Sequence, residues 1–480
     1  MVLALVLPFW IALFVIAYDV YLLIRIGYMS VHLLYAYRRL KEYRDVDWIE
    51  KLESSETKLN WKKVHHIIVI PTYDESIHVL RTSIESLLQT DFPKDRMHVV
   101  IGFEERAGEQ AKERARTLTK EFGGTFGTFL TSFHPDGMEG EKRVKSANAS
   151  WAMQQMEKKL AGAGISDDMI LVSNLDSDTV VPSGYFSYLT YVFVTIDDPY
   201  RASYQPIPVY NNNLWDAPSF SRVVAMGSTF WQMIESTRPE RLVTFSSHSM
   251  TLVALHDVGY WQRNIISEDS RIFWQCLLRY DGKYRTVPLY TTVSMDAALA
   301  PSWWQTLSNQ YKQKRRWAWG IENFPYLAEG FLHNKKIPFG IKFTYLFRTV
   351  EGHYSWATSA IIVAVLGWIP VLFGDPSFHR TFLSYSLPFI TRTLMTIAMS
   401  GLIVSATLTI LLLPHKPQHY SPWRYLLIIL QWALVPLIAT LLSAFPALDS
   451  ETRLMLGRDL NFNVMQKTRK HVTARGIESV

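Results

Sequence analysis

Cysteine is nearly absent from this sequence of 480 residues, and Cys276 is its single member. One cysteine excludes an intrachain disulfide and a zinc site built from several cysteines. Cys276 lies within the apolar stretch 272–278, so we expect a buried thiol with no reactive role.

The sequence also lacks a large excess of either charge. Its formal net charge is +6, which does not by itself indicate a nucleic-acid-binding surface, and we expect no nucleic acid among the partners. Hydrophobic residues make up 48% of the chain, yet charged residues still make up 19%, which is too many for a purely transmembrane bundle. The composition therefore predicts a soluble domain and a membrane part in one chain.

Four long apolar runs indicate where the chain meets a membrane. The first, at 3–26, is long enough to cross a hydrocarbon core of about 30 Å as a helix. A secretory signal peptide fits this run poorly, because no positive charge precedes it and no small-residue cleavage site follows it. The other runs lie at 354–373, 387–413 and 425–445. We therefore expect an integral protein of the plasma or inner membrane, with the lipid bilayer as a partner.

The charges that flank these runs predict an orientation. The basic residues Arg25, Arg38, Arg39, Lys41 and Arg44 follow the first run, so the positive-inside rule places the next domain in the cytoplasm. Four crossings would then place the C-terminal tail outside. The tail nevertheless carries a basic set that is typical of the inside, namely Arg453, Arg458, Lys467, Arg469, Lys470 and Arg475. These two signals disagree, and Pro436 leaves open that the last run re-enters the membrane without crossing it.

Between the membrane runs, predicted strands alternate with predicted helices. Apolar runs at 65–71, 97–103 and 169–175 predict buried strands, and helical spacing of apolar residues marks 79–89, 109–122 and 146–160. This alternation predicts an α/β, Rossmann-like domain with a mostly parallel sheet, combined with α-helical transmembrane segments. The predicted division is a transmembrane helix at 1–28, a juxtamembrane helical linker at 29–60, the cytoplasmic domain at 61–345, transmembrane helices at 346–446 and a basic tail at 447–480.

Acidic side chains follow each predicted strand. They are Asp74 and Glu75, Glu104 and Glu105, and the Asp-x-Asp pair Asp176 and Asp178. Ligands bind at the carboxyl ends of strands in sheets of this kind. Two carboxylates at positions i and i+2 of extended chain point the same way, so Asp176 and Asp178 could hold Mg²⁺ or Mn²⁺ against a diphosphate. A solvated turn explains an isolated Asp-x-Asp equally well.

Two later segments carry a different chemistry. Glu268 and Asp269 precede an apolar helix, where acids are often helix caps, but Asp269 could also accept the proton of an attacking hydroxyl. The segment 310–319 is basic and aromatic, as in a juxtamembrane helix that contacts lipid headgroups. In a functional interpretation, Arg316 neutralises a leaving diphosphate and Trp317 packs against the acceptor sugar.

The sequence leaves the role of one further segment open and predicts a structural role for one histidine. The segment 204–213 is rich in amide and aromatic side chains, which would suit either a sugar acceptor or a structural loop. His248 precedes the apolar residues 250–255, and we expect a hydrogen-bonded core histidine there.

In order along the chain, these motifs resemble those of the family 2 inverting glycosyltransferases. The order is Asp74, Glu104, Asp176-Ser177-Asp178, Glu268-Asp269 and Gln313-x-x-Arg316-Trp317, with membrane helices on both sides. More narrowly, the pattern is similar to the membrane-bound processive group that includes cellulose and hyaluronan synthases. The resemblance spans about 67–320 plus the membrane flanks, and it implies a GT-A-like catalytic domain.

The resemblance also implies a role for each matching residue. In this pattern the nucleotide-sugar donor is contacted by Asp74, Glu104, Lys145, Asn148, Asp176, Gln313 and Arg316. Asp176 and Asp178 bind the metal. Asp269 acts in catalysis together with Glu268, and Trp317 belongs to the acceptor site. Three positions depart from the usual pattern. Glu104 replaces an aspartate near the uracil, Ser150 replaces an asparagine, and Ser267 replaces the threonine before Glu-Asp. A UDP-sugar is still the favoured donor, but Glu104 leaves the base preference open.

The implied reaction is an inverting, metal-dependent transfer from a nucleotide-diphosphate sugar to a polysaccharide acceptor at the membrane. A lipid acceptor, such as a polyprenyl phosphate or a glycolipid, is the alternative, and the small number of apolar runs favours it. A non-catalytic membrane scaffold or translocation subunit is a third hypothesis. The presence of every acid of the pattern argues against the third.

Overall fold

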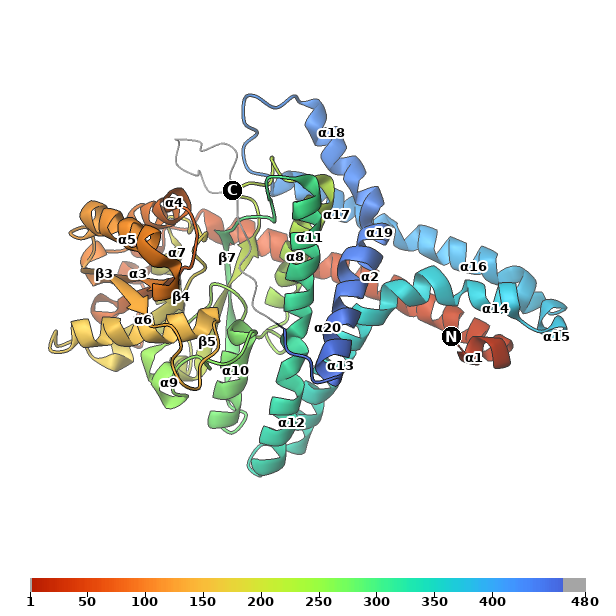
Figure 1. Ribbon diagram of the computed structural model, residues 1–480, viewed down its shortest axis with the longest axis horizontal. Helices are drawn as coiled ribbons and strands as arrows, with labels where there is room; N and C mark the ends of the chain where they lie inside the picture. Colours follow the sequence, from red (N-terminus) through yellow and green to blue (C-terminus); the bar gives the residue numbers. More distant parts are fainter. Residues whose placement is uncertain (1, 461–480) are drawn as a thin grey trace.

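The computed structural model describes residues 2–460 (Figure 1). An α/β domain lies at the left of this view, and long helices extend from it to the right. The predicted basic tail is described only as far as residue 460, so Lys467, Arg469, Lys470 and Arg475 lie outside the described residues.

A seven-stranded sheet forms the centre of the α/β domain, in the order β3-β2-β1-β4-β6-β5-β7. Its strands are β1 (His65–Pro71), β2 (Met97–Glu104), β3 (Thr128–His134), β4 (Ile170–Asn174), β5 (Ala202–Val209), β6 (Ser249–Thr251) and β7 (Arg285–Ser294). Only β6 runs antiparallel to its neighbours β4 and β5, whereas the other pairings are parallel. The predicted mostly parallel α/β sheet is therefore confirmed.

Helices cover both faces of this sheet. One face packs against α4 (Ile77–Leu88), α5 (Gly108–Phe122) and α7 (Tyr185–Thr195), and the other against α6 (Lys145–Leu160) and α10 (Glu268–Arg279). Strands β1, β2 and β4 are buried along almost their whole length, which explains why they read as continuous apolar runs. The three predicted helices of this region are confirmed to within two residues at each end.

The amide-rich segment 204–213 is mostly part of the sheet. Residues 204–209 belong to the buried strand β5. Beyond it, Asn212 Nδ2 donates to the Asp178 carbonyl oxygen at 2.9 Å. Asn213 exchanges two hydrogen bonds with the backbone of Ala297, at 3.0 and 2.8 Å. These contacts give the amides of Asn212 and Asn213 a structural role.

Three histidines gather at the amino ends of β1 and β2. His65 Nδ1 lies 3.0 Å from His98 Nε2, and His66 Nε2 lies 2.8 Å from Thr190 Oγ1. Burial lowers the pKa of His98 from 6.5 to about 4, and it lowers the pKa of His66 well below 6.5. Both rings are therefore neutral in the folded protein at pH 7.

A pH dependence of stability follows from these rings. As the pH falls below about 6.5, the unfolded chain takes up protons before the folded protein does, so the free energy of unfolding should decrease between pH 6.5 and 4. We expect His98→Gln to remove up to about 2 kcal/mol of this decrease. Thermal unfolding in detergent at pH 7.5 and 5 measures it. An equally steep decrease in the variant and in the parent would contradict the role of His98.

Within residues 2–460, four helices are long and apolar enough to cross a membrane, and they coincide with the four predicted apolar runs. They are α2 (Pro8–Arg44), α13 with α14 (Phe339–Phe373), α16 with α17 (Phe382–Leu411), and α18 to α20 (Trp423–Met455). In Figure 1, α2 and α16 extend side by side away from the α/β domain. The last helix instead runs across their direction, beside α11 (Trp303–Ala318).

The carboxyl-terminal half of α2 belongs to the core of the α/β domain. Leu33, Ala36 and Leu40 are buried in a cluster with α8 (Ser219–Ser236) and β5. His32 Nδ1 also lies 2.7 Å from Thr237 Oγ1, just past the end of α8. One continuous helix thus joins the apolar N-terminal run to the domain.

Candidate active site

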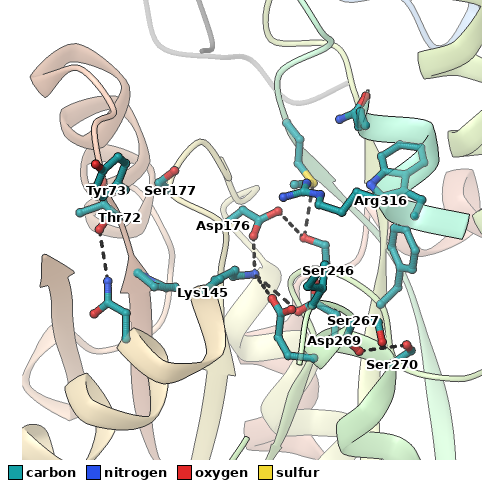
Figure 2. Close-up of a pocket in the computed structure, with 18 of the residues that line it drawn as sticks. Thr72, Tyr73, Lys145, Asp176, Ser177, Ser246, Ser267, Asp269, Ser270 and Arg316 are labelled. Carbon is teal, nitrogen blue, oxygen red and sulfur yellow. Dashed lines mark hydrogen bonds and ion pairs between the residues drawn. The ribbon is translucent and has the colours of Figure 1, made fainter. Parts of the chain in front are cut away.

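A pocket of about 210 Å³ opens at the carboxyl ends of β1, β2 and β4 (Figure 2). Its walls include most of the residues singled out from the sequence: Glu104, Lys145, Asn148, Asp176, Glu268, Asp269, Gln313, Arg316 and Trp317. These residues come from the carboxyl ends of β2 and β4, from the first turns of α6 and α10, and from α11. The acids at the strand ends and the residues of the two later segments therefore line the same pocket.

Asp74 and Asp178 are not among the residues that line this pocket. The side chain of Asp74 is 61% exposed and lies 3.5 Å from Arg114. Asp178 is fully buried, and its Oδ2 accepts a hydrogen bond from the backbone N–H of Asp296 at 2.8 Å. Of the Asp-x-Asp pair, Asp176 lines the pocket and Asp178 supports the loop behind it, so the predicted ligand role of Asp178 and the nucleotide contact of Asp74 stay predictions.

Lys145 lies in the middle of the acids of the pocket. Its Nζ pairs with Asp176 and lies 3.5 Å from Asp269 Oδ1 and 3.8 Å from Glu268 Oε1. Figure 2 shows the Lys145 side chain pointing toward Asp176 and Asp269. Burial lowers the pKa of Lys145, but the three carboxylates outweigh burial and raise it above its ordinary value. The ammonium group is therefore a fixed positive charge in the pocket.

The two acids at the start of α10 differ in their access to the pocket. The side chain of Glu268 is 5% exposed, whereas that of Asp269 is 25% exposed. Burial raises the pKa of Glu268, the charge of Asp269 raises it further, and Lys145 opposes both. A general base must be within reach of its substrate, so Asp269 is the better candidate and Glu268 supports it.

His248 lies behind Asp269, with its Nδ1 3.8 Å from Asp269 Oδ1. Its Nδ1 also lies 2.9 Å from the Phe245 carbonyl oxygen, and its Nε2 accepts from Trp261 Nε1 at 3.3 Å. Burial lowers the pKa of the ring. His248 is thus the hydrogen-bonded core histidine that the sequence predicted.

Three predicted residues share one face of α11. Gln313, Arg316 and Trp317 are spaced at i, i+3 and i+4, which places them side by side on a helix, and all three line the pocket. Lys314 points elsewhere: its Nζ donates to Ser228 Oγ at 3.1 Å and lies 4.5 Å from the ring centre of Trp317. Burial lowers the pKa of Lys314 to about 7.

Several residues of the pocket were not predicted as site residues from the sequence. Ser246 Oγ donates to Asp176 Oδ2 at 2.7 Å, and the next residue, Ser247, has a left-handed φ of 64°. Tyr210 and Phe245 form an aromatic wall with Trp317, at ring distances of 6.0 and 6.3 Å from it. Tyr210 belongs to the segment 204–213, for which the sequence left an acceptor role open, whereas nothing in the local sequence marks Ser246 or Phe245. Asp296 also lines the pocket, and it follows β7 as the other acids follow their strands.

Asn148 connects the ends of β1 and β2. Its Nδ2 donates to the carbonyl oxygens of Thr72 and Gly102, at 3.2 and 2.7 Å. A Cβ at Gly102 would lie 2.4 Å from Asn148 Oδ1, so glycine is required there for the close approach. Asn148 thus shapes the pocket floor between two strands.

We expect Asn148→Leu to lower the free energy of unfolding by about 2 to 3 kcal/mol, because two buried carbonyl groups lose a donor. Thermal unfolding of the purified protein measures the change. Gln154→Leu, at a half-buried position of the same helix, should leave stability nearly unchanged. Equal losses in the two variants would show that the two hydrogen bonds of Asn148 make no specific contribution to stability.

The acids of the pocket suit a hard divalent cation only in part. Their oxygen atoms are the ligands that Mg²⁺ and Mn²⁺ prefer. Among residues 2–460, however, no group of three or more His, Cys, Asp or Glu side chains is placed to hold a metal ion. Mg²⁺ is often held by one or two carboxylates together with substrate phosphates, and Asp176 fits that smaller role.

Comparisons with known proteins give a weak likeness. No family model matches the chain, and neither does any curated protein. Among solved structures, the mannosyltransferase PcManGT from Pyrobaculum calidifontis in complex with GDP-Man and Mn²⁺ has a TM-score of 0.41 and 13% identity, over 88% of this chain and 99% of that one. S. aureus TarS 1-349 in complex with UDP-GlcNAc has a TM-score of 0.38 and 12% identity, over 86% and 100%. Similarity this low does not assign a function to the chain.

Proposed function

We propose that this chain is a membrane-bound glycosyltransferase that transfers a sugar from a nucleoside-diphosphate sugar to a hydroxyl acceptor, with inversion at the anomeric carbon. The observation that carries the proposal is the composition of one pocket. It combines a fixed cation, Lys145, with a candidate base, Asp269, and with a cationic and aromatic helix face at Arg316 and Trp317. The same residues match the glycosyltransferase pattern of the sequence.

The donor occupies the side of the pocket nearest β1 and β2. The base and ribose lie beside Thr72, Tyr73, Glu104 and Asn148, which line that side. The diphosphate lies between Lys145 and Arg316, whose charges stabilise the negative charge that develops on the leaving group. A UDP-sugar is the favoured donor.

The acceptor approaches from the aromatic side. Tyr210, Phe245 and Trp317 offer faces on which a sugar ring packs. Asp269 accepts the proton of the attacking hydroxyl as its oxygen bonds to the anomeric carbon, opposite the diphosphate. A single displacement of this kind inverts the configuration and needs no carboxylate nucleophile.

A bound Mg²⁺ or Mn²⁺ would be held by Asp176, with Asp178 as the second ligand that the resemblance implies. When bound, it supplies positive charge to the leaving diphosphate. Lys145 already pairs with Asp176 in this structure, so the protein's own cation and the metal act on the same carboxylate.

The acceptor is a polysaccharide in the first version of the proposal and a lipid in the second. The small number of apolar helices favours a lipid acceptor, because few helices remain to enclose a channel for a growing chain. The size of the product separates the two: a ladder of long carbohydrate chains supports the first, and a single glycolipid supports the second.

Release of free nucleoside diphosphate tests the proposal. The detergent-purified protein is incubated with Mg²⁺ or Mn²⁺, total membrane lipid and a panel of UDP- and GDP-sugars. We expect release with one donor and loss of that release in Asp176→Ala. If no donor is hydrolysed or transferred, and no nucleotide protects the protein from thermal unfolding in the presence of metal, the non-catalytic scaffold is the better explanation.

A further inference from the structure

The fourth apolar helix, Trp423–Met455, contacts the α/β domain at both of its ends. This helix consists of α18 (Trp423–Leu430), a short 3-10 segment, α19 (Val435–Ala439), a π segment at Thr440–Ala444 and α20 (Phe445–Met455). Its sequence is as apolar as that of the other three membrane helices. Its position in the fold is different from theirs.

The amino end is fastened to the loop that follows β5. Trp215 Nε1 donates to the Pro414 carbonyl oxygen at 3.0 Å, and Arg424 donates to the Trp215 carbonyl oxygen at 2.6 Å. About two turns further on, the buried Arg222 of α8 donates to Gln431 Oε1 at 2.7 Å. The start of the helix is therefore held on the α/β domain by polar contacts.

The carboxyl end is fastened to α11 and to the rim of the pocket. Arg315 donates to Asp449 Oδ2 at 3.0 Å, and Lys142 lies 3.3 Å from Asp459. Leu454 and Leu460 pack with Trp319 in a small cluster that also includes Ile266, which lines the pocket. The end of the helix is thus held on the same domain as its start.

The middle of the helix also lies on the domain. Trp432 stacks on Phe230 of α8 with ring centres 5.7 Å apart, and Ile438 and Leu442 are buried in the same cluster as α8. In Figure 1 the helix runs beside α11 and crosses the direction of α2 and α16.

A membrane-crossing helix carries its two ends to opposite sides of a hydrocarbon core about 30 Å thick. The α/β domain lies on one side of that core, so a helix held on it at both ends does not cross. We propose that Trp423–Met455 lies in the plane of the membrane surface, with its outward face in the acyl chains of the leaflet next to the domain, and that the chain crosses the bilayer three times.

The outward face of this helix fits acyl chains as its partner. It exposes a row of large apolar side chains that includes Trp423, Leu427, Leu430 and Leu437, at 74, 59, 58 and 57% exposure. The neighbouring helix α17 (Ser400–Leu411) contacts α18 directly and also exposes large apolar side chains, Ile403 and Leu411. An in-plane helix with one apolar face binds a leaflet in this way.

The proposal also resolves the conflict between the flanking charges. After three crossings, residues 456–460 at the end of the described chain lie on the same side as the α/β domain. Arg453 and Arg458 then lie on the side where the positive-inside rule places basic residues. The inference does not use the chemistry of the pocket, so it holds or fails separately from the proposed reaction.

Single cysteines test the topology. Because Cys276 is the one native cysteine and is buried, Cys276→Ser gives a clean background. Lys112→Cys, Arg380→Cys, Gln418→Cys and Met455→Cys place exposed thiols on the domain, the far loop, the near loop and the end of the helix. In sealed vesicles of both orientations, a membrane-impermeant maleimide should label 112, 418 and 455 from one side and 380 from the other. Labelling of 455 from the same side as 380 would overturn the proposal.

A second measurement does not depend on sidedness. Nitroxide labels at Leu427, Leu434 and Leu441 in liposomes report depth through collisions with oxygen and with a water-soluble nickel complex. In-plane placement predicts one shallow depth and high oxygen access at all three, whereas a crossing helix separates the outer two by about 20 Å in depth. A depth gradient, or low oxygen access because a second copy covers the face, would overturn the assignment.

Discussion

Asp269→Asn is expected to lower the rate of sugar transfer by at least about 1,000-fold while leaving the donor bound. The asparagine keeps the size of the side chain but cannot accept the proton of the attacking hydroxyl. Asp269 lies 3.5 Å from Lys145 without a short contact to it, so the pocket keeps its shape when the charge is removed. The loss should therefore appear in kcat rather than in donor affinity.

The measurement for Asp269→Asn is transfer rate together with nucleotide binding by calorimetry. Asp45→Asn, at an exposed acid far along the chain from the pocket motifs, is the matched control and should be fully active. Unchanged transfer in Asp269→Asn would rule out its role as the base. Loss of donor binding along with activity would instead assign Asp269 to the donor site.

Lys145→Met is expected to reduce transfer by about 100-fold or more and to weaken nucleoside diphosphate binding. The substitution removes the ammonium group that lies between Asp176, Asp269 and Glu268. Without it, the three carboxylates repel one another and the incoming diphosphate, and the pKa of Glu268 rises further because Lys145 no longer opposes the rise. Lys145→Arg should retain part of the activity, since it keeps the charge.

Metal concentration distinguishes this explanation from simple misfolding. Lys145→Met frees Asp176 from its ion pair, and a divalent cation prefers free carboxylates, so added Mn²⁺ should replace part of the missing positive charge and restore part of the activity. Transfer is measured over a Mn²⁺ series, with thermal unfolding as the check on folding. A stable variant whose activity does not respond to Mn²⁺ would argue that Lys145 acts only on the diphosphate.

The strands that the sequence predicted are those whose two faces are both covered. β1, β2 and β4 are buried throughout, so each is a continuous apolar run. β5 is buried too, but it contains Pro206 and Pro208, which argue against a strand. The structure accommodates them through a register shift between Gln205 and Ile207 where β5 pairs with β7. Local sequence does not reveal that irregularity.

The acids that follow recognised strands could be predicted as site residues from the sequence. The residues that reach the site only through the order of the strands in the sheet could not. Glu104 and Asp176 follow strands that were recognised, and both line the pocket. Asp296 follows β7, whose half-buried and polar residues hid the strand and therefore the acid. Ser246 reaches Asp176 only because β6 inserts antiparallel between β4 and β5, a pairing that no spacing in the sequence shows.

Hydropathy and packing disagree about the last apolar run for a physical reason. Hydropathy measures how strongly a segment avoids water, and it does not distinguish lipid from the apolar surface of a neighbouring helix. Ile438 and Leu442 are buried against the chain's own α8 cluster, while Leu437 and Leu441 point outward. A segment of this kind scores as a transmembrane helix whether or not it crosses.

The single helix α2 sets a limit on how this protein can be cut. A soluble fragment would ordinarily begin just after the apolar run, yet Leu33, Ala36 and Leu40 are part of the domain's interior. A fragment that starts at residue 45 would expose the apolar surface of α8 on which these side chains pack, and it would be prone to aggregate. A fragment that begins near residue 29 keeps these three side chains on α8, but it exposes other apolar residues of α2, such as Val31 and Leu34, to solvent.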